Sequence, residues 1–449
     1  MRPATAAPVD LLGKVRPEDA SPRAERASER PMRLLMVTQY YWPEDFSAGI
    51  YMPELAESLC SRGHEVQVLT GFPNYPHGRI LPGYRRRVFQ VEERRGVRVI
   101  RTWIYPSPRS SGGLRRGATA LSFALSAVLA RGAVRPPDVV LGFSPPPFMG
   151  LAALSCARRF RVPLLLNVKD LFTEAVLASG LARPGPLARA LSAVERRLYR
   201  SADRVIAPVR DFLPVLAESG VAADSLAVIP DWADGKTIRP QPKENPIRRE
   251  WGCRDRFVIL YSGSIGYSSC LEPVLRAAAL LREDPRFVFL LVGDGPLRAG
   301  LEMLARELEL PNVQFHPLQS RERFPEVLAA ADVTLVTLSP SGGRVSTQGK
   351  LYSLLAAGRP VLGIVPPGNE AARVIEENGC GWSVSPQDPS ALAALLRLLP
   401  EDQEDLERRG ASARSAFEAK YSLAVTAAQF EAHLRELAFT RPDPGVLPR

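Results

Sequence analysis

Histidine and cysteine are scarce in this sequence, and their scarcity argues against several kinds of site. With four histidines, the chain is a poor candidate for a multi-histidine metal centre. The five cysteines are widely separated, odd in number and never spaced as CxxC. That pattern is typical of reduced thiols and not of a disulfide framework or a zinc site. We therefore expect a cytoplasmic protein.

Long apolar runs are also missing. No stretch approaches the ~18 consecutive apolar residues that span a bilayer. Residues 1–31 mix Ala, Pro, Arg and Glu and lack the continuous apolar core of a signal peptide. Because such a segment has little to bury, we expect a disordered N-terminal extension.

Several motifs of common α/β enzymes are absent as well. No GxGxxG turn follows the first predicted strand, which argues against a dinucleotide-dependent dehydrogenase. Neither the GxxxxGK[ST] of P-loop nucleotidases nor the GxSxG of α/β-hydrolases occurs. The net charge of +10 suits an anionic partner such as a phosphorylated molecule or an acidic membrane. The basic residues of the chain are dispersed and form no nucleic-acid-binding motif, so we expect no nucleic acid partner.

The 449 residues are too many for one ordinary core, so two domains are expected. Short apolar strands alternate with amphipathic helices twice, on either side of a proline-rich and charged linker near residues 228–252. This alternation predicts an α/β protein with two doubly wound, Rossmann-like domains that face each other across a cleft. We place the domains at residues 32–225 and 226–410, and expect a helix at 411–440 to cross back to the first domain.

Two glycine-rich turns follow strands of the second predicted domain. Gly263, Ser264 and Gly266 stand between a strand and a helix, where glycine lets the backbone approach an anion closely. An ordinary tight turn would need the same glycines. Gly293 and Asp294 repeat the arrangement, and Asp294 either caps the next helix, which we favour, or bonds a ligand hydroxyl.

A third loop carries a lysine at an unusual place. The stretch "SPSGGRVSTQGKLYSLLAAG" puts Lys350 in the first turn of a predicted helix. Because the helix dipole is already positive there, a cation is unfavourable unless an anion lies beside it. Three such loops at the carboxyl ends of strands predict a diphosphate cradle. The alternative is a solvated lysine on a loop.

Taken together, these segments resemble a known family. The stretches "QYYWPEDFSAG", "GFSPPPFMGL", "KDLFTEAVLASG", "YSGSIG", "LLVGDGP" and "GKLYSLLAAGRPVLGIV" are similar to those of retaining glycosyltransferases of family 4, which have the GT-B fold. The likeness extends over residues 32–437 and is greatest to the type that builds colanic acid and O-antigen. It implies a nucleotide-sugar donor, with UDP the family-based choice, in the second domain. A polyprenyl-diphosphate-linked sugar acceptor is implied in the first.

The resemblance also implies roles for individual residues. Lys350 corresponds to the phosphate-binding lysine, and Asp170 lies in the "DLWPE"-like motif, written here "DLFTE". Such enzymes need no metal or other cofactor, since lysine, helix dipoles and backbone amides stabilise the leaving diphosphate. We expect Lys350 and Asp170 to be catalytic, although Asp170 could equally be a helix N-cap. The expected substrate-binding residues are Gly49, Asn74, His77, Gly263, Ser264, Gly266, Gly293, Asp294, Ser346, Thr347, Gly349 and Ser353. Of these, Asn74 and His77 belong to a predicted acceptor loop after a strand, "FPNYPHGRI", for which the alternative is an ordinary loop shaped by proline and glycine.

Several positions depart from the family pattern. Val345 and Ser353 stand where general members have two glutamates eight positions apart, so sugar and ribose contacts cannot be transferred. Phe172 and Thr173 replace a tryptophan and a proline. Two alternatives therefore stay open beside the transferase: a nucleotide-sugar 2-epimerase on the same fold, and a sugar-nucleotide-binding subunit without catalysis.

The segment at residues 114–131 suggests a membrane contact. Its apolar centre is bracketed by Arg115, Arg116 and Arg131. A lipid-linked acceptor requires docking on an anionic membrane face, and such a helix is suited to it. The alternative is a helix buried in the α/β layer. We favour the buried helix; if the helix instead docks on lipid, the cytoplasmic protein is peripheral on the inner membrane face.

Overall fold

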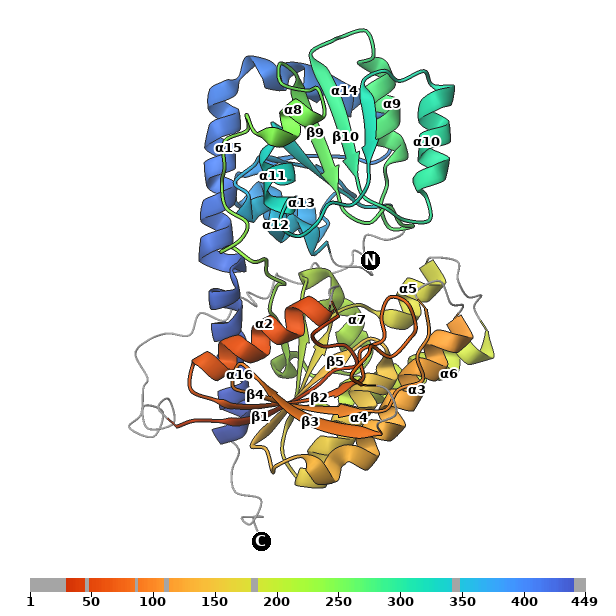
Figure 1. The fold of residues 1–449 in the computed structure, drawn as a ribbon, viewed down its shortest axis with the longest axis vertical. Coiled ribbons are helices and arrows are strands. Elements are labelled where there is room, and N and C mark those ends of the chain that lie inside the picture. Colours follow the sequence, from red (N-terminus) through yellow and green to blue (C-terminus); the bar gives the residue numbers. More distant parts are fainter. Residues whose placement is uncertain are drawn as a thin grey trace, which may run out of the picture.

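The computed structural model describes residues 30–44, 48–84, 88–108, 113–178, 185–340 and 348–439. It contains two parallel sheets, each covered by helices on both faces, and a long helical segment that runs along both domains (Figure 1). The predicted pair of doubly wound domains is confirmed. Most of the N-terminal extension expected at 1–31 lies outside the described residues.

The first domain has an eight-stranded sheet with the order β3-β4-β2-β1-β5-β6-β7-β8. All neighbouring strands are parallel except β3 and β4, which form an antiparallel hairpin at the edge. The strands are β1 (Arg33–Val37), β2 (Glu65–Gly71), β3 (Phe89–Arg94), β4 (Val97–Thr102), β5 (Val139–Ser144), β6 (Leu164–Val168), β7 (Arg204–Ala207) and β8 (Leu226–Val228). The helices are α2 (Ala48–Ser61), α3 (Gly113–Leu129), α4 (Pro147–Phe160), α5 (Phe172–Ala178), α6 (Pro186–Arg200) and α7 (Leu213–Glu218).

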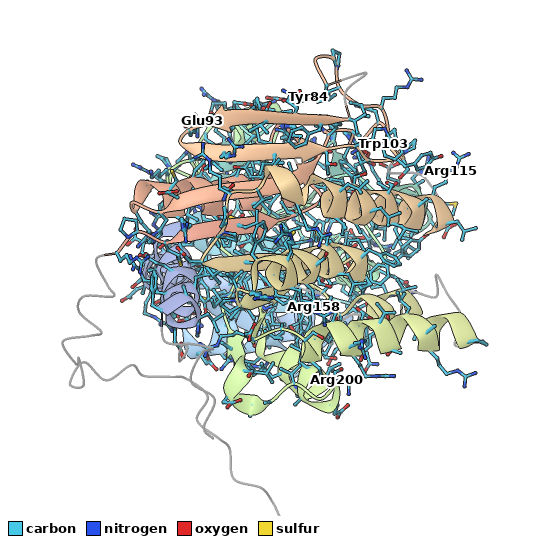
Figure 2. All side chains as sticks on the ribbon, turned by 90° about the horizontal axis from the view of Figure 1, so that it is seen from below. Tyr84, Glu93, Trp103, Arg115, Arg158 and Arg200 are labelled. Atoms are coloured by element: carbon cyan, nitrogen blue, oxygen red, sulfur yellow. The ribbon has the colours of Figure 1, made fainter. Side chains whose placement is uncertain are left out.

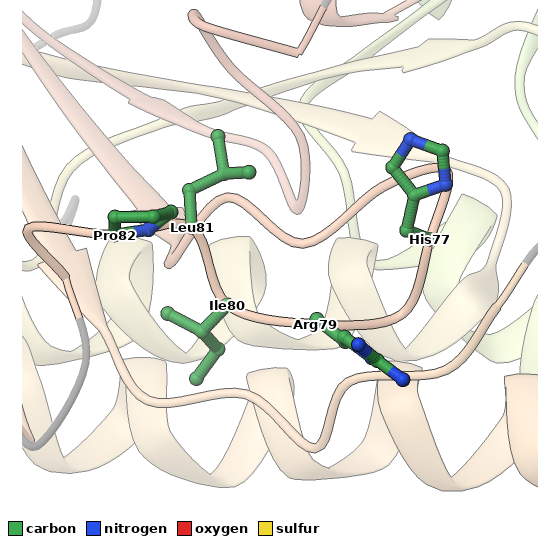
Figure 3. Close-up of a pocket in the computed structure, with 5 residues that line it drawn as sticks. All are labelled: His77, Arg79, Ile80, Leu81 and Pro82. Carbon is green, nitrogen blue, oxygen red and sulfur yellow. The ribbon is translucent and has the colours of Figure 1, made fainter.

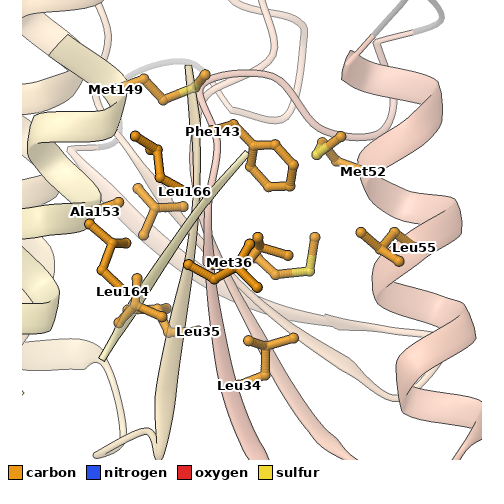
Figure 4. Packing of buried hydrophobic residues seen from close by; sticks show 14 of the residues in the cluster. Leu34, Leu35, Met36, Met52, Leu55, Phe143, Met149, Ala153, Leu164 and Leu166 are labelled. Atoms are coloured by element: carbon orange, nitrogen blue, oxygen red, sulfur yellow. The ribbon is translucent and has the colours of Figure 1, made fainter. Parts of the chain in front are cut away.

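Both faces of this sheet are buried, which explains why its central strands are almost wholly apolar. Side chains alternate along a strand. Leu34 and Met36 of β1 therefore point toward α2, whereas Leu35 points toward α4 (Figure 4). Met52 from α2 and Met149 from α4 cover the two sides (Figure 4).

The second domain has a six-stranded, fully parallel sheet with the order β11-β10-β9-β12-β13-β14. Its strands are β9 (Phe257–Ser262), β10 (Phe287–Val292), β11 (Val313–His316), β12 (Val333–Thr337), β13 (Val361–Ile364) and β14 (Gly381–Val384). Its helices are α8 (Pro246–Glu250), α9 (Glu272–Leu280), α10 (Arg298–Glu307), α11 (Phe324–Ala329), α12 (Lys350–Ala356), α13 (Glu370–Glu377) and α14 (Pro389–Leu398).

The chain crosses between the domains twice, at adjacent places. Helix α15 (Gln403–Ala416) ends in a π-helical turn, and α16 (Leu423–Phe439) continues onto α2 of the first domain. The outgoing linker meets this return crossing in a bridge between Ala233 and Ser422. A Cβ on Gly235 would lie 2.4 Å from the Phe417 ring, so the crossings pack closely.

Ion pairs fix α16 on the first domain. Glu431 accepts hydrogen bonds from Arg62 at 3.1 Å and from the buried His64 at 2.9 Å. The backbone N–H of Met32 donates to the other ring nitrogen of His64. Within the described part of the chain, no helix is both long and apolar enough to cross a bilayer.

Candidate active site

The carboxyl ends of strands from both sheets meet at the boundary between the domains. A small cavity of about 10 Å³ there is lined by Val209 and Asp211 of the first domain and by Gln348, Tyr352 and Glu370 of the second. In open parallel sheets, ligands bind outside the carboxyl ends of the strands. This boundary is therefore the candidate site.

The two glycine turns of the second domain pack directly against each other. β9 and β10 pair in register up to Ser262 and Val292, so the loops that follow begin side by side. A Cβ on Gly293 would lie 1.9 Å from the carbonyl oxygen of Gly263. Ile265 donates its backbone N–H to the Asp294 carbonyl at 2.9 Å. Glycine at these positions therefore permits a close approach between two backbones.

One prediction about these turns is wrong. Asp294 does not cap a helix: its carboxylate accepts from the N–H of Gly295 at 2.8 Å, within the turn itself. Helix α10 starts later, at Arg298, without a side-chain cap. Similarly, α9 begins only at Glu272, so Gly266 does not lie at a helix N-terminus. The backbone of the turns, and not an adjoining helix, forms this part of the site.

Lys350 is on α12, which follows β12, and it approaches these turns from the side of β9 opposite to β10. Its ammonium donates to the phenolic oxygen of Tyr261 at 2.6 Å and lies 4.1 Å from the centre of that ring. A Cβ built on Gly263 would lie 3.3 Å from the same ammonium. Tyr261 in turn donates to the Ser264 carbonyl at 2.6 Å. The lysine and the first glycine turn therefore form one cluster, and a cation held there can stabilise a diphosphate.

Gly349 is the point where the second domain touches the first in this cluster. A Cβ on Gly349 would lie 3.3 Å from the hydroxyl of Tyr51 in α2 and 3.9 Å from the Asp231 carboxylate. Asp231 is buried and forms an ion pair with Lys169. Burial, with Asp231 and Glu54 nearby, raises the pKa of Tyr51 well above its usual value, so this hydroxyl is neutral at physiological pH.

Sequence reasoning missed Tyr261, Lys169 and Tyr51. A signal for Lys169 was present, since it directly precedes Asp170 at the end of a strand. Asp231 lies in "VIPDWAD", at the start of the predicted linker. Tyr261 and Tyr51 carry no local signal, because an aromatic residue in a strand or helix is usually part of the core.

Asp170 follows β6 at the same edge of the first sheet as Lys169. Next to it, Thr173 takes the place of the family's proline and is buried. Its hydroxyl and its backbone N–H both donate to the carboxylate of Glu195, which also accepts from Tyr199 at 3.0 Å. The hydroxyl that Thr173 brings in place of the family's proline thus has a buried hydrogen-bond acceptor, the Glu195 carboxylate of α6.

The predicted acceptor loop is organised by Glu44. This buried carboxylate accepts backbone hydrogen bonds from Asn74 and Tyr75, each at 2.9 Å. The Asn74 side chain is buried and donates to the Phe72 carbonyl within its own loop, and its contact with a substrate stays a prediction. A Cβ on Gly49 would lie 2.0 Å from the Glu44 carbonyl, which gives Gly49 a packing role.

His77 lies at the exposed end of this loop. With Arg79, Ile80, Leu81 and Pro82 it lines a cavity of about 440 Å³ on the first domain (Figure 3). Its backbone pairs with Pro108 in an isolated bridge. A role of His77 at the acceptor stays a prediction.

The remaining predicted residues are only partly described. Ser346 and Thr347, together with Val345, lie outside the described residues. Ser353 is half-buried on α12, three positions after Lys350, and hence on the same side of that helix. In the described part of the chain, no group of three or more His, Cys, Asp or Glu side chains is placed to hold a metal ion.

Comparisons with known proteins agree with this geometry. Residues 48–232 match the family model described as "Glycosyl transferase 4-like domain", and residues 244–416 match "Glycosyl transferases group 1". WcaI of Escherichia coli K12, described as a colanic acid biosynthesis glycosyl transferase, is 32% identical over 389 residues. That alignment covers 82% of this chain and 93% of WcaI. WbjE of Pseudomonas aeruginosa, described as a glycosyltransferase, is 31% identical over an alignment that covers 67% of this chain and 75% of WbjE.

Solved structures share the fold. HepE from Anabaena in complex with UDP superposes with a TM-score of 0.66 at 17% identity and covers 90% of this chain and all of that one. Sucrose-phosphate synthase from Thermosynechococcus elongatus gives 0.71 at 20% identity and covers 92% of this chain and all of that one. The predicted GT-B fold is confirmed, and the chain belongs to the group 1 glycosyltransferases.

Proposed function

We propose that this protein is a retaining glycosyltransferase of bacterial surface polysaccharide synthesis. It transfers a sugar from a nucleotide diphosphate donor, with UDP the best candidate, to a sugar on a polyprenyl diphosphate. The observation that carries the proposal is the Lys350 ammonium held against the Gly263 turn. The relative WcaI, described as a colanic acid biosynthesis glycosyl transferase, supports the process, WbjE supports the transferase activity, and the UDP bound by HepE supports the nucleotide.

The chemistry follows from charge. When the glycosidic bond to the diphosphate breaks, negative charge develops on the β-phosphate oxygen. Lys350 stabilises that charge without a metal ion, together with those backbone amides of the glycine turns that are not already bonded to the turns or to neighbouring strands. In front-face attack, the departing phosphate oxygen accepts the proton of the acceptor hydroxyl, so the sugar keeps its configuration. A well-placed donor of this type contributes about 3–4 kcal/mol.

The test is acceptor-dependent release of UDP or GDP from a panel of nucleotide sugars, with polyprenyl-diphosphate-linked sugars as acceptors. Lys350→Ala is expected to lower turnover about 100-fold or more. Lys236→Ala is the matched control, because Lys236 is exposed. Normal kinetics in Lys350→Ala would remove the lysine from the site. Isomer formation without acceptor would identify an epimerase, and binding without turnover a non-catalytic subunit.

The outer face of α3 supports membrane docking of the first domain. Leu114, Leu121, Leu125 and Leu129 are 91%, 45%, 60% and 85% exposed, and their spacing places them along one side of the helix. Arg115 is exposed at the start of this helix (Figure 2). Arg131 does not extend outward, because its guanidinium bonds Val128 and Ser155. An exposed leucine stripe with basic residues at one end fits an anionic bilayer.

Flotation with vesicles tests this part of the proposal. Wild-type protein is expected to float with vesicles that contain anionic lipid and to float less with neutral ones. The double variant Leu121→Ser/Leu125→Ser should lose most of this binding. Substituting the exposed Leu318 and Leu398 of the second domain in the same way is the control. Absence of wild-type binding to anionic vesicles would end the membrane proposal and leave the transferase proposal intact.

A further inference from the structure

Lys169 lies at the end of β6, at the boundary between the two domains. Its backbone N–H donates to the Ser144 carbonyl at 2.7 Å, which holds its position relative to β5. Its ammonium forms an ion pair with Asp231 of the linker. The side chain of Asp231 is 7% exposed, whereas that of Lys169 is 20% exposed. The lysine is therefore the member of the pair that remains accessible.

Asp231 connects Lys169 to the predicted donor site. One carboxylate oxygen pairs with the Lys169 ammonium, and the other would lie 3.9 Å from a Cβ placed on Gly349. Gly349 directly precedes Lys350, whose ammonium lies against the Gly263 turn. A single carboxylate thus separates the Lys169 ammonium from the segment that carries the phosphate-binding lysine.

The charge of the expected ligand calls for a second cation. A nucleotide diphosphate carries more than one negative charge, and Lys350 supplies a single ammonium. Arg298 is engaged elsewhere, since it bonds Glu302 and the carbonyls of Gly293 and His316. An ammonium has three N–H donors. In the part of the chain that the structure describes, Asp231 is the hydrogen-bond partner of Lys169, which leaves donors available.

We propose that Lys169 is a donor-binding residue of the first domain, which Asp231 holds in place to bind the diphosphate together with Lys350. The proposal rests on the function proposed above and adds a residue to it. Its consequence is that the diphosphate is bound by both domains. The first domain then takes part in donor binding in addition to holding the acceptor.

Calorimetric titration of the full-length protein with UDP and with uridine tests the proposal. A hydrogen bond between charged groups contributes enough binding free energy that Lys169→Met should weaken UDP binding roughly tenfold to a hundredfold. Uridine affinity should stay within about twofold, because uridine lacks the diphosphate. Lys169→Arg should retain most of the UDP affinity. Unchanged UDP binding by a folded Lys169→Met variant, or an equal loss for uridine, would overturn the proposal.

A double-mutant cycle separates ligand binding from mere neutralisation of Asp231. If Lys169 only offsets the charge of Asp231, Lys169→Met/Asp231→Asn should regain wild-type UDP affinity, which would overturn the proposal. If Lys169 contacts the diphosphate, the double variant should bind as weakly as Lys169→Met. Wild-type protein that binds neither UDP nor GDP would instead refute the proposed function itself.

A measurement on the wild-type protein covers the case in which Lys169→Met does not fold. Brief acetylation followed by mass spectrometry reports the reactivity of each lysine. Saturating UDP should protect Lys169 and Lys350, whereas uridine should protect neither, and exposed Lys236 should react equally throughout. Equal labelling of Lys169 with and without UDP, while Lys350 is protected, would refute the assignment.

Discussion

The ammonium of Lys350 and the hydroxyl of Tyr261 are 2.6 Å apart, and the same hydroxyl donates to the Ser264 carbonyl at 2.6 Å. Tyr261 accepts from the lysine and donates to the turn, so its single O–H group links the two parts of the predicted phosphate site. The buried ring also lies under the cation, where the negative face of an aromatic ring is favourable. Tyr261 therefore determines where the lysine charge is presented.

Replacing Tyr261 by phenylalanine should weaken UDP binding about tenfold, because the ring remains while a hydrogen bond to a charged group is lost. Titration calorimetry measures the change. Tyr267→Phe is the control, since Tyr267 follows the same turn but is exposed. Equal affinities of the two variants would show that the hydroxyl does not position Lys350.

Gly293→Ala should damage the site through the backbone. The new Cβ would lie 1.9 Å from the Gly263 carbonyl, so the two turns must separate, at a cost of about 1–3 kcal/mol in the free energy of unfolding. We expect a lower Tm together with a loss of UDP binding. Gly300→Ala in α10 meets nothing within 4 Å and should raise stability by up to about 1 kcal/mol. UDP affinity retained in Gly293→Ala would contradict a role for the paired turns.

The stability of the protein should depend on pH through Glu44. Burial raises the pKa of this carboxyl to about 7, against the opposing effect of hydrogen bonds from Asn74 and Tyr75. The folded state therefore binds a proton more tightly than the unfolded state, in which the pKa of this carboxyl is about 4.5. This contribution is present below pH 4.5 and is lost as the pH rises through 7; it amounts to about 3 kcal/mol at most.

Glu44→Gln should remove this dependence, because a neutral amide can still accept the backbone hydrogen bonds. Tm measured from pH 4.5 to 8 should fall less steeply for the variant than for wild type. Parallel curves would show that Glu44 does not titrate in this range.

Asp211 of the first domain bonds the N-terminus of α13 in the second domain, beside the N-cap residue Asn369. Its carboxylate accepts from the N–H of Glu370 at 2.9 Å and forms an ion pair with Arg373, while the adjacent Arg210 pairs with Glu370 and Glu377. Asp211→Ala should lower stability by about 1–2 kcal/mol. It should also loosen the contact between the domains, which small-angle scattering would detect as a larger radius of gyration.

Asp388→Ala is the matched control for this contact. Asp388 caps α14 within the second domain, where it accepts from Ala391 at 2.8 Å. Its loss should lower Tm to a similar extent without changing the radius of gyration. Identical scattering from Asp211→Ala and wild type, also at low salt where ion pairs are strongest, would refute the coupling.

Much of the architecture was predictable from the sequence because it depends on local periodicity. Apolar strands such as "FVILYS" and "FVFLLV" alternate with helices of period 3.6, and this pattern has few solutions other than two doubly wound domains. The predicted cluster of Lys350 with the Gly263 turn could be proposed for the same reason. The carboxyl ends of parallel strands meet at one edge, so loops that follow those strands must lie together.

Predictions about individual polar side chains were less successful, because short-range alternatives have similar energies. Asp294 satisfies the N–H of its own turn and not a helix terminus, and both arrangements fit the same sequence. For Asn74, the sequence does not show that its side chain bonds the Phe72 carbonyl or that the Glu44 carboxylate, 30 positions earlier, accepts its backbone N–H; its substrate contact stays a prediction.

The sequence by itself determined the two domains, their glycine turns and the presence of a lysine beside them, because each follows from spacing along one segment. Only the tertiary structure decided which groups surround that lysine. Tyr261 and Lys350 are 89 positions apart, and Lys169 and Asp231 are 62 apart. Such pairs form when sheets and domains pack, and no local propensity encodes the distance between two side chains on different elements.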